Sequence, residues 1–496
     1  MKTVINLLLI LFTLFPLLLS AKSVSPFDFG YATARIGEER YKVLFKTHSE
    51  AIKRGVTVDY TGLERIDLTI PSSAKSIPLS NYCDFKGVTF VVENKRKNFF
   101  LFSLQSKAHV IDIPKQLLGT KMNSIPTLGN RDALLCIYDN NPWVQNRKGY
   151  DYGATRRDIV VVEKGVMKNV TIMPYNNKFS LPICSYYPLT KEQKVVKNVT
   201  LIRTEDSQYK TYLLQIDGQY HVSISDIKIV TPKSLLKSDK AISVTNSANV
   251  CFSDIVISGT YSQVKESGYG IQMNNVYDVS FIRMKAEASW GVFGTNNIQY
   301  ARLTDCDINR FDIHCYGRDV YCKNCTFRNV YNQFSSVFGT VKFSNCSFID
   351  CCPVLIEYSY NAYTGFDIVF EKCYFKATRG KNCIVNAGYL DDVKNERPEL
   401  KQKCWPNIYI NGLKIDAAED VKSVYLMKLR KAVTSHFPLG YATSFQLENI
   451  TIVGENSPEV MITNYDIPVR NKIKVTQSKS SRSSVIIKNN LTKEKN

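Results

Sequence analysis

A short alternating pattern of polar and apolar residues recurs along most of the chain. Each copy has a polar residue, an apolar residue or Cys, any residue, and a second apolar residue, as in Asn198-Val199-Thr200-Leu201. A period of two predicts a short β-strand in each copy, with one face buried. The copies begin at Gly87, Asn169, Asn198, Asp226, Asp254, Arg283, Asp305, Asn324, Asn345, Lys372, Gly412 and Asn449.

The spacing of the copies indicates how the strands are arranged. From Asn169 onward, successive copies follow at intervals of roughly 20 to 40 residues, which is the period of stacked repeats. No long helical pattern separates them, so alternating strand and helix units are disfavoured. A coil of this length that closes on itself suits a solenoid of parallel strands. The sequence therefore predicts an all-β solenoid in a single chain.

The second position of each copy is expected to point inward and to stack on its equivalents. Cys occupies this position in four copies and Val, Ile, Met or Leu in the others, so a small apolar side chain fits there. We interpret these four Cys as buried thiols, although 14 Cys in a secreted chain usually indicate disulfides. The predicted ladder is Val170, Val199, Ile227, Ile255, Met284, Cys306, Cys325, Cys346, Cys373, Leu413 and Ile450.

Two local features of the repeat have alternative interpretations. Asn at the start of a copy forms a glycosylation sequon in five cases, but Asn also suits a tight turn because it tolerates the left-handed conformation. Cys322 and Cys325 have the C-x-x-C spacing of zinc sites. No matching second pair or His follows, so no metal site is predicted. No cofactor motif is found, and calcium stays open.

The ends of the chain differ from the repeat. Residues 1–23 have Lys2, an apolar core and small residues near the end, which is typical of a secretory signal peptide. Residues 24–93 are interpreted as an N-terminal cap and first coil, in which residues 38–54 have helical spacing and are expected to cover the open end. The β-helix is assigned to residues 94–465, of which 94–165 read as irregular or short strands. Residues 466–496 are expected to be a flexible basic tail.

Charge and compartment together narrow the partners. The chain has 64 Lys and Arg against 45 Asp and Glu, a net charge of +19. A basic balance of this size favours polyanionic partners. Because the signal peptide predicts a secreted or periplasmic protein with no transmembrane segment, we expect an acidic polysaccharide rather than nucleic acid.

Together, the signal peptide, the helix, the repeat and its turns that carry Asn and Cys resemble the right-handed parallel β-helix of the pectin-lyase-like superfamily. The resemblance covers roughly residues 30–460. It implies a single-stranded right-handed parallel β-helix with an N-terminal capping helix. It also implies polysaccharide lyases, glycoside hydrolases or non-catalytic surface proteins as functional classes. The chain lacks the Gly-His-Gly and Asn-Thr-Asp motifs of polygalacturonases and a clear calcium-binding Asp set, so the specific family stays open.

The candidate chemistry lies where the coils are shortest. Between Met284 and Cys346 the step falls to about 20 residues, and longer loops follow, which predicts a groove across the coils. Residues 309–318 read NRFDIHCYGR. If Ile313 and Cys315 face inward, the residues that alternate with them face outward on one strip. These are Asp312, His314 and Tyr316, with Arg310 and Arg318 at the edges.

Neighbouring coils are expected to complete this site. Aligning Gly294, Gly317 and Gly339 places small residues beside His314 and aromatic side chains beside Tyr316. The small residues are Gly291 and Ser336, and the aromatic ones are Phe293 and Phe338. Further along the expected groove, the residues that we assign to substrate binding are Gln272 and Trp290 on one side and Glu357 on the other, together with Arg318.

Three functions fit these residues. In a lyase, a base removes the proton α to a uronate carboxylate and a cation neutralises that carboxylate. His314 or Tyr316 would be the base or acid, Arg310 or Arg318 the cation, and Asp312 would orient His314. In a hydrolase, two carboxylates flank the bond, and Asp312 with Glu357 is the candidate pair. In a binder, the groove holds glycan without cleavage. We expect a lyase; the linkage, the source organism and the oligomeric state stay open.

Overall fold

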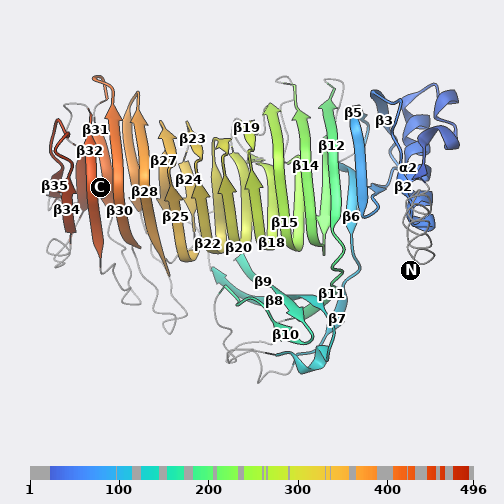
Figure 1. Ribbon diagram of the computed structural model, residues 1–496, viewed down its shortest axis with the longest axis horizontal. Coiled ribbons are helices and arrows are strands. Elements are labelled where there is room, and N and C mark those ends of the chain that lie inside the picture. Colours follow the sequence, from blue (N-terminus) through green and yellow to red (C-terminus); the bar gives the residue numbers. More distant parts are fainter. Residues whose placement is uncertain are drawn as a thin grey trace, which may run out of the picture.

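In the computed structural model, the chain forms one long stack of parallel strands with a smaller sheet beside it (Figure 1). The structure is described for residues 23–96, 98–113, 124–144, 154–172, 183–204, 209–232, 240–259, 262–263, 266–267, 269–288, 291–329, 331–335, 337–356, 365–387, 406–421, 423–429, 444–453, 458–463 and 473–490. The signal peptide prediction falls on residues 1–23, and all but Ser23 lie outside the described residues, so it stays a prediction.

A single 26-stranded sheet winds along the molecule, and its strand pairings are parallel. The predicted solenoid is thus confirmed as a parallel β-helix. Its strands are β3 (Arg65–Ile70), β4 (Ile77–Pro78), β5 (Tyr82–Asn94), β6 (Phe99–Gln105), β12 (Lys194–Arg203), β13 (Thr211–Asp217), β14 (Tyr220–Val230), β15 (Ile242–Gly259), β18 (Tyr269–Ile282), β19 (Lys285–Ala288), β20 (Gly291–Thr304), β21 (Asp307–Ile308), β22 (Phe311–Lys323), β23 (Thr326–Arg328), β24 (Tyr331–Phe334), β25 (Val337–Ser344), β26 (Ser347–Ile349), β27 (Cys352–Ile356), β28 (Gly365–Ala377), β29 (Lys381–Ala387), β30 (Asn407–Ala417), β31 (Ser423–Leu429), β32 (Phe445–Ile452), β33 (Glu459–Thr463), β34 (Ile473–Gln477) and β35 (Ile486–Asn490).

The inward ladder is confirmed from Val199 onward. Val199 pairs with Ile227 and Ile227 with Ile255 in strict register, and every ladder residue from Val199 to Ile450 is buried. Cys306, Cys325, Cys346 and Cys373 are free, buried thiols. Each thiol donates to the carbonyl oxygen two residues before it, at 3.2 to 3.5 Å. Burying a Cys here therefore leaves its weak donor paired.

The residue that starts each copy is a turn residue, as expected for Asn. Asn198, Asp226 and Asn324 have φ of 58°, 54° and 54°, in the left-handed region. Asn and Asp tolerate this conformation better than other residues with a Cβ. Their side chains also bond from coil to coil, as in Asn324 Nδ2 to Asp305 Oδ1 at 3.0 Å.

The copy at Asn169 is not part of the ladder, and its assignment is wrong. Between β6 and β12 the chain forms a separate antiparallel sheet, below the β-helix in Figure 1. Val170 is 61% exposed, and Asn169 bonds to the backbone of Ile159 and Val161. The sheet has the order β10-β9-β8-β11-β7, with the bounds β7 (His109–Ile111), β8 (Ala133–Val144), β9 (Ala154–Glu163), β10 (Val166–Met167) and β11 (Ile183–Pro188).

The inserted sheet has its own core and docks on the corners of the β-helix. Leu135, Ile137 and Val160 belong to that separate core. At the docking face, the Arg157 backbone N–H donates to Asn297 Oδ1 at 2.9 Å, and Gln299 Nε2 donates to Asp158 Oδ1 at 3.2 Å. These contacts hold the sheet beside the coil of β20.

The predicted N-terminal helix is present as α2 (Gly37–Arg54), at the N-terminal end of the stack in Figure 1. Tyr41, Leu44 and Ala51 on its buried face join the main core. Its role as a cap stays a prediction. The other short elements are β1 (Ser23–Val24), β2 (Thr57–Val58), β16 (Ser262–Gln263), β17 (Glu266–Ser267) and the 3-10 turns Pro26–Phe29, Tyr31–Thr33 and Pro126–Leu128.

The C-terminal segment differs from the flexible tail that we expected. Within it, β34 pairs with β32 and β35 pairs with β33, so residues 473–490 add strands to the β-helix. The segment Ile473-Lys474-Val475 alternates apolar and polar residues, as a strand does. The prediction of a flexible tail rested on the Lys-rich composition and did not use this alternation. Among the described residues, no helix is long and apolar enough to cross a membrane.

Candidate functional site

The site residues come from the first half of β22. Phe311 and Ile313 point into the main core. Asp312 pairs with Gly294 on the preceding coil and with Gln333 on the next one. The register shifts after Ile313: Thr295 pairs with Ile313, but Asn296 pairs with Cys315. His314 is therefore the extra residue of a β-bulge, a feature that redirects a side chain and is frequent near active sites.

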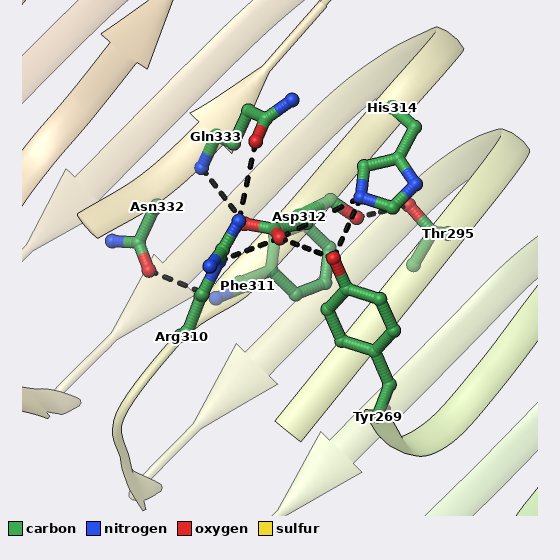
Figure 2. Close-up of polar contacts among 8 residues, drawn as sticks. All are labelled: Tyr269, Thr295, Arg310, Phe311, Asp312, His314, Asn332 and Gln333. Carbon is green, nitrogen blue, oxygen red and sulfur yellow. Dashed lines mark hydrogen bonds and ion pairs between the residues drawn. The ribbon is translucent and has the colours of Figure 1, made fainter. Parts of the chain in front are cut away.

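Asp312 is fully buried and accepts three interactions (Figure 2). Its Oδ2 lies 2.6 Å from Arg310 Nε and 2.9 Å from the Tyr269 hydroxyl, which donates to it. Its Oδ1 accepts from the backbone N–H of Gln333 at 3.1 Å. The buried Asp312 carboxylate thus has one cation and two neutral donors as partners.

Arg310 is equally buried and is matched to Asp312. Its guanidinium carbon lies 4.2 Å from the centre of the Tyr331 ring, and Nη2 donates to Gln333 Oε1 at 3.2 Å. Burial works against the charged guanidinium, but the carboxylate of Asp312 outweighs it and raises the pKa of Arg310. Both side chains of the pair are closed to solvent.

His314 connects the buried pair to the protein surface. Its Nε2 lies 2.7 Å from the Tyr269 hydroxyl and 3.7 Å from Asp312 Oδ2, and its side chain is 19% exposed. Because the Tyr269 hydroxyl donates its one hydrogen to Asp312, the Nε2–H of His314 donates to the Tyr269 oxygen. The neutral imidazole then has its lone pair on Nδ1.

Tyr269 reaches this group across an intervening coil. It belongs to β18, whereas Asp312 belongs to β22, and β20 lies between them. A Cβ at position 294 would lie 2.6 Å from Cγ of the Tyr269 ring. Only glycine at 294 lets the ring lie across β20. Sequence reasoning missed Tyr269, although a glycine inside a strand is a signal of close approach.

The predicted exposed strip is wrong. Asp312 is 0% exposed, Arg310 1% and Tyr316 2%, so only His314 presents part of its side chain to solvent. The bulge at His314 and the left-handed conformation of Tyr316, with φ of 56°, break the alternation on which the strip depended. Arg310 faces a carboxylate of the protein and is not placed to neutralise a substrate.

The glycine alignment was also wrong. Gly294 pairs with Asp312, Gly317 pairs with Ile298, and Gly291 pairs with Tyr269 rather than lying beside His314. Phe293 is a core residue stacked in register on Phe311, so it offers no platform for a sugar. The alignment failed because it offset the two coils by 317 − 294 = 23 residues, whereas the register is 312 − 294 = 18 residues before the bulge and 317 − 298 = 19 after it.

Two of the predicted binding residues are described. Arg318 Nη1 donates to the carbonyl of Ile172 at 3.2 Å, which ties it to the inserted sheet, and its side chain stays 35% exposed. Gln272 pairs with Gly294, and its Oε1 accepts from Lys240 Nζ at 2.8 Å. Trp290, Glu357 and Ser336 lie outside the described residues. The groove stays a prediction, because residues 357–364 and 388–405 also lie outside them.

The described residues were also compared with the ligand sets of metal sites. Among the described residues, no group of three or more His, Cys, Asp or Glu side chains is arranged to hold a metal ion. Cys322 and Cys325 are both buried in the main core.

Comparison with known proteins bears on the fold. No protein-family model matches the sequence, and a search of curated proteins finds no match. The tailspike protein gp49 from Pseudomonas phage LKA1 is similar in structure, with a TM-score of 0.57 and 13% identity over 89% of this chain and 80% of that one. At this identity the likeness shows the fold alone, and it agrees with the parallel β-helix.

Two further tailspikes share less of the geometry. Gp61 of Pseudomonas phage phi297 has a TM-score of 0.43 and 12% identity over 88% of this chain and 81% of its own. Gp54 of Acinetobacter baumannii bacteriophage AP22, solved with a capsular saccharide, has a TM-score of 0.37 and 10% identity over 94% of this chain and 79% of its own. All three comparison structures are tailspikes.

Proposed function

We propose that this protein is a lyase that cleaves an acidic polysaccharide by β-elimination, with His314 as the base. The observation that carries the proposal is the linked series Arg310, Asp312, Tyr269 and His314. It joins a buried ion pair to one partly exposed imidazole. An imidazole held in one tautomer by a hydroxyl group that itself donates to a carboxylate is suited to proton transfer.

The reaction assigns each proton and electron pair. Nδ1 of His314 would take the proton from the carbon α to a uronate carboxylate. The electron pair of that C–H bond forms a carbon–carbon double bond, and the bond from the β carbon to the glycosidic oxygen breaks. The proton held by His314 then passes to the leaving oxygen. Asp312 stabilises the transient imidazolium through Tyr269, since the two lie in one hydrogen-bonded series.

Arg310 and Arg318 have different roles in this proposal. Arg310 holds the Asp312 carboxyl group in place, because the two side chains form a buried pair. Arg318 also pairs with a carboxylate, since its Nε lies 3.5 Å from Asp319 Oδ2, but its side chain stays 35% exposed. It lies four positions after His314 on β22, so we assign it to the uronate carboxylate. Tyr316 is buried and would act only by supporting the turn.

A hydrolase is the weaker alternative. Its two carboxylates must reach the glycosidic oxygen and the anomeric carbon. Asp312 is fully buried and paired with Arg310, so it is not placed to touch a sugar. Its proposed partner Glu357 lies outside the described residues. A non-catalytic glycan binder is the third function, and the same assay separates it from both enzymes.

The test is a panel of polygalacturonate, alginate and hyaluronan. A lyase yields the ultraviolet absorbance of an unsaturated product, and His314→Ala lowers turnover by roughly 10²–10⁴. His109→Ala is the matched control, because His109 lies in the inserted sheet and stacks on Tyr186. New reducing ends without the chromophore indicate a hydrolase, and binding without either product indicates a binder.

A further inference from the structure

A row of residues in register extends from the site toward the N-terminal coils, and Gln215 and Gln272 in it are partly exposed. In register, the row consists of Gln215, Ser243, Gln272, Gly294, Asp312 and Gln333. Neighbouring strands lie about 4.8 Å apart, so Gln272 is about 10 Å from Asp312 along the stack. An extended ligand that reaches His314 can therefore also reach Gln272.

Lys240 lies beside Gln272, and its ammonium group is held by contacts with three side chains. Lys240 Nζ donates to Gln272 Oε1 at 2.8 Å. The same nitrogen lies 5.9 Å from the centre of the Phe100 ring and 5.7 Å from that of Tyr212. The two rings contact each other with centres 4.8 Å apart. An ammonium held by two ring faces and an amide loses less freedom on binding an anion than a mobile lysine does.

We propose that Lys240 binds an acidic group of the substrate, on a sugar residue other than the one attacked at His314. Lys240 and Gln272 are both partly exposed, so an anion can approach them from solvent. Phe100, the partly exposed ring of the pair beside Lys240, supplies apolar surface suited to a sugar ring. The inference rests on the proposed function in one respect: the substrate is an acidic polysaccharide that passes His314.

The inference makes a statement about substrate structure. Acidic groups must recur along the polymer so that one lies about 10 Å from the attacked sugar, two strand spacings away. A short acidic fragment that fills only the His314 end would bind without help from Lys240.

The test measures binding rather than turnover. Affinity electrophoresis is run with polygalacturonate, alginate and hyaluronan and with the carboxyl-reduced form of each. Lys240→Gln is expected to weaken binding of the acidic polymer roughly 10- to 100-fold, the range for a lost charged hydrogen bond, and to leave the reduced polymer unchanged. The difference in affinity for the acidic polymer between wild type and Lys240→Gln should become smaller as the salt concentration rises.

The matched control is Lys414→Gln. Lys414 Nζ lies 5.6 Å from the centre of the Tyr374 ring, but β30 carries it in a different row of the β-helix. If Lys240→Gln does not fold, Gln272→Ala is used instead, and it should weaken acidic binding by removing the amide that holds the ammonium. Melting by circular dichroism checks the fold of each variant.

Three results would overturn the inference. They are equal weakening of acidic and reduced polymers, an effect no larger than that of Lys414→Gln, and no preference of the protein for any acidic polymer over its reduced form. Failure of the proposed function is distinct: the wild-type protein would bind the acidic polymer through Lys240 and release no unsaturated product.

Discussion

The hydroxyl of Tyr269 donates a 2.9 Å hydrogen bond to Asp312 across an entire coil of the β-helix. Tyr269 starts β18, Asp312 lies in β22, and Gly294 on β20 lies beneath the ring that connects them. His314 bonds to the same hydroxyl. The candidate site is thus a property of three consecutive coils, and substitutions on each coil should affect it differently.

Tyr269→Phe removes the hydroxyl and keeps the ring. Asp312 retains Arg310 and the Gln333 N–H, so the free energy of unfolding should fall by only about 1–2 kcal/mol. His314 loses the group that orients its Nε2, so kcat should fall while KM for the acidic polymer stays nearly constant. Steady-state kinetics provide the measurement. The control is Tyr300→Phe, because Tyr300 is an exposed tyrosine on β20. A raised KM at unchanged kcat would contradict the orienting role.

Gly294→Ala tests the same contact from the middle coil. The new Cβ would lie 2.6 Å from Cγ of Tyr269, so the ring must leave its position over β20. Activity should fall to about the level of Tyr269→Ala. In the double variant Gly294→Ala/Tyr269→Ala the losses should not add, because both changes remove one interaction. Additive losses would mean that Gly294 acts independently of Tyr269.

The stacking of the coils could be predicted from the sequence because its causes are local. Alternation places Ile227 or Cys325 inward whatever the rest of the chain does, and a left-handed Asn or Asp turns the chain before it. The contact between Tyr269 and Asp312 spans 43 residues and has no local signature. The bulge at His314 depends on the register with β20, which one strand alone does not define.

The errors outside the site have the same origin. Asn169-Val170 has the pattern of a coil, but period-2 alternation is common to parallel and antiparallel strands. Only the pairing partners show that this segment belongs to the inserted sheet. Likewise, the Lys-rich composition after residue 470 indicated a loose tail, whereas the pairing of β34 with β32 shows a strand.

The Cys ladder should be inert in the folded protein. Burial raises the pKa of the Cys373 thiol to about 11, and a hydrogen bond with Cys325, together with burial, raises the pKa of Cys306 well above its ordinary value. Iodoacetamide at pH 8 should leave Cys306, Cys325, Cys346 and Cys373 unmodified until denaturant is added. Peptide mass spectrometry provides the measurement. Finding these residues in disulfides would overturn the assignment of free thiols.

The cost of replacing one ladder thiol should be modest. Cys325→Val preserves the apolar character and approximate volume, and the lost donor made only a weak bond to the Lys323 carbonyl. We expect the free energy of unfolding to fall by less than about 1.5 kcal/mol. Cys325→Asp is the contrasting variant, because it places a carboxyl group in the core and should prevent folding. Urea denaturation of both variants tests the position.

The last prediction concerns His48, a buried histidine under the first coils. Its side chain lies on α2, 0% exposed, with Nε2 2.6 Å from the Tyr60 hydroxyl and the rings of Phe85 and Phe102 beside it. Burial lowers the pKa of His48 to about 3. In the unfolded chain the pKa is near its ordinary value of about 6.5. Below that pH the unfolded chain therefore binds a proton that the folded chain does not bind.

The free energy of unfolding should accordingly be constant with respect to His48 above about pH 6.5 and fall as the pH decreases toward 3, by up to about 1.4 kcal/mol per pH unit. Burial raises the pKa of Asp217 and Asp278, but both carboxyl groups are present in wild type and in His48→Gln, so the difference between the two proteins from about pH 5.5 to 7 reports on His48. Urea midpoints of wild type and His48→Gln across this range provide the measurement. Because glutamine retains a partner for Tyr60 and does not titrate, the slope should largely disappear. An equal slope in His48→Gln would show that acid destabilises the protein elsewhere than beneath α2.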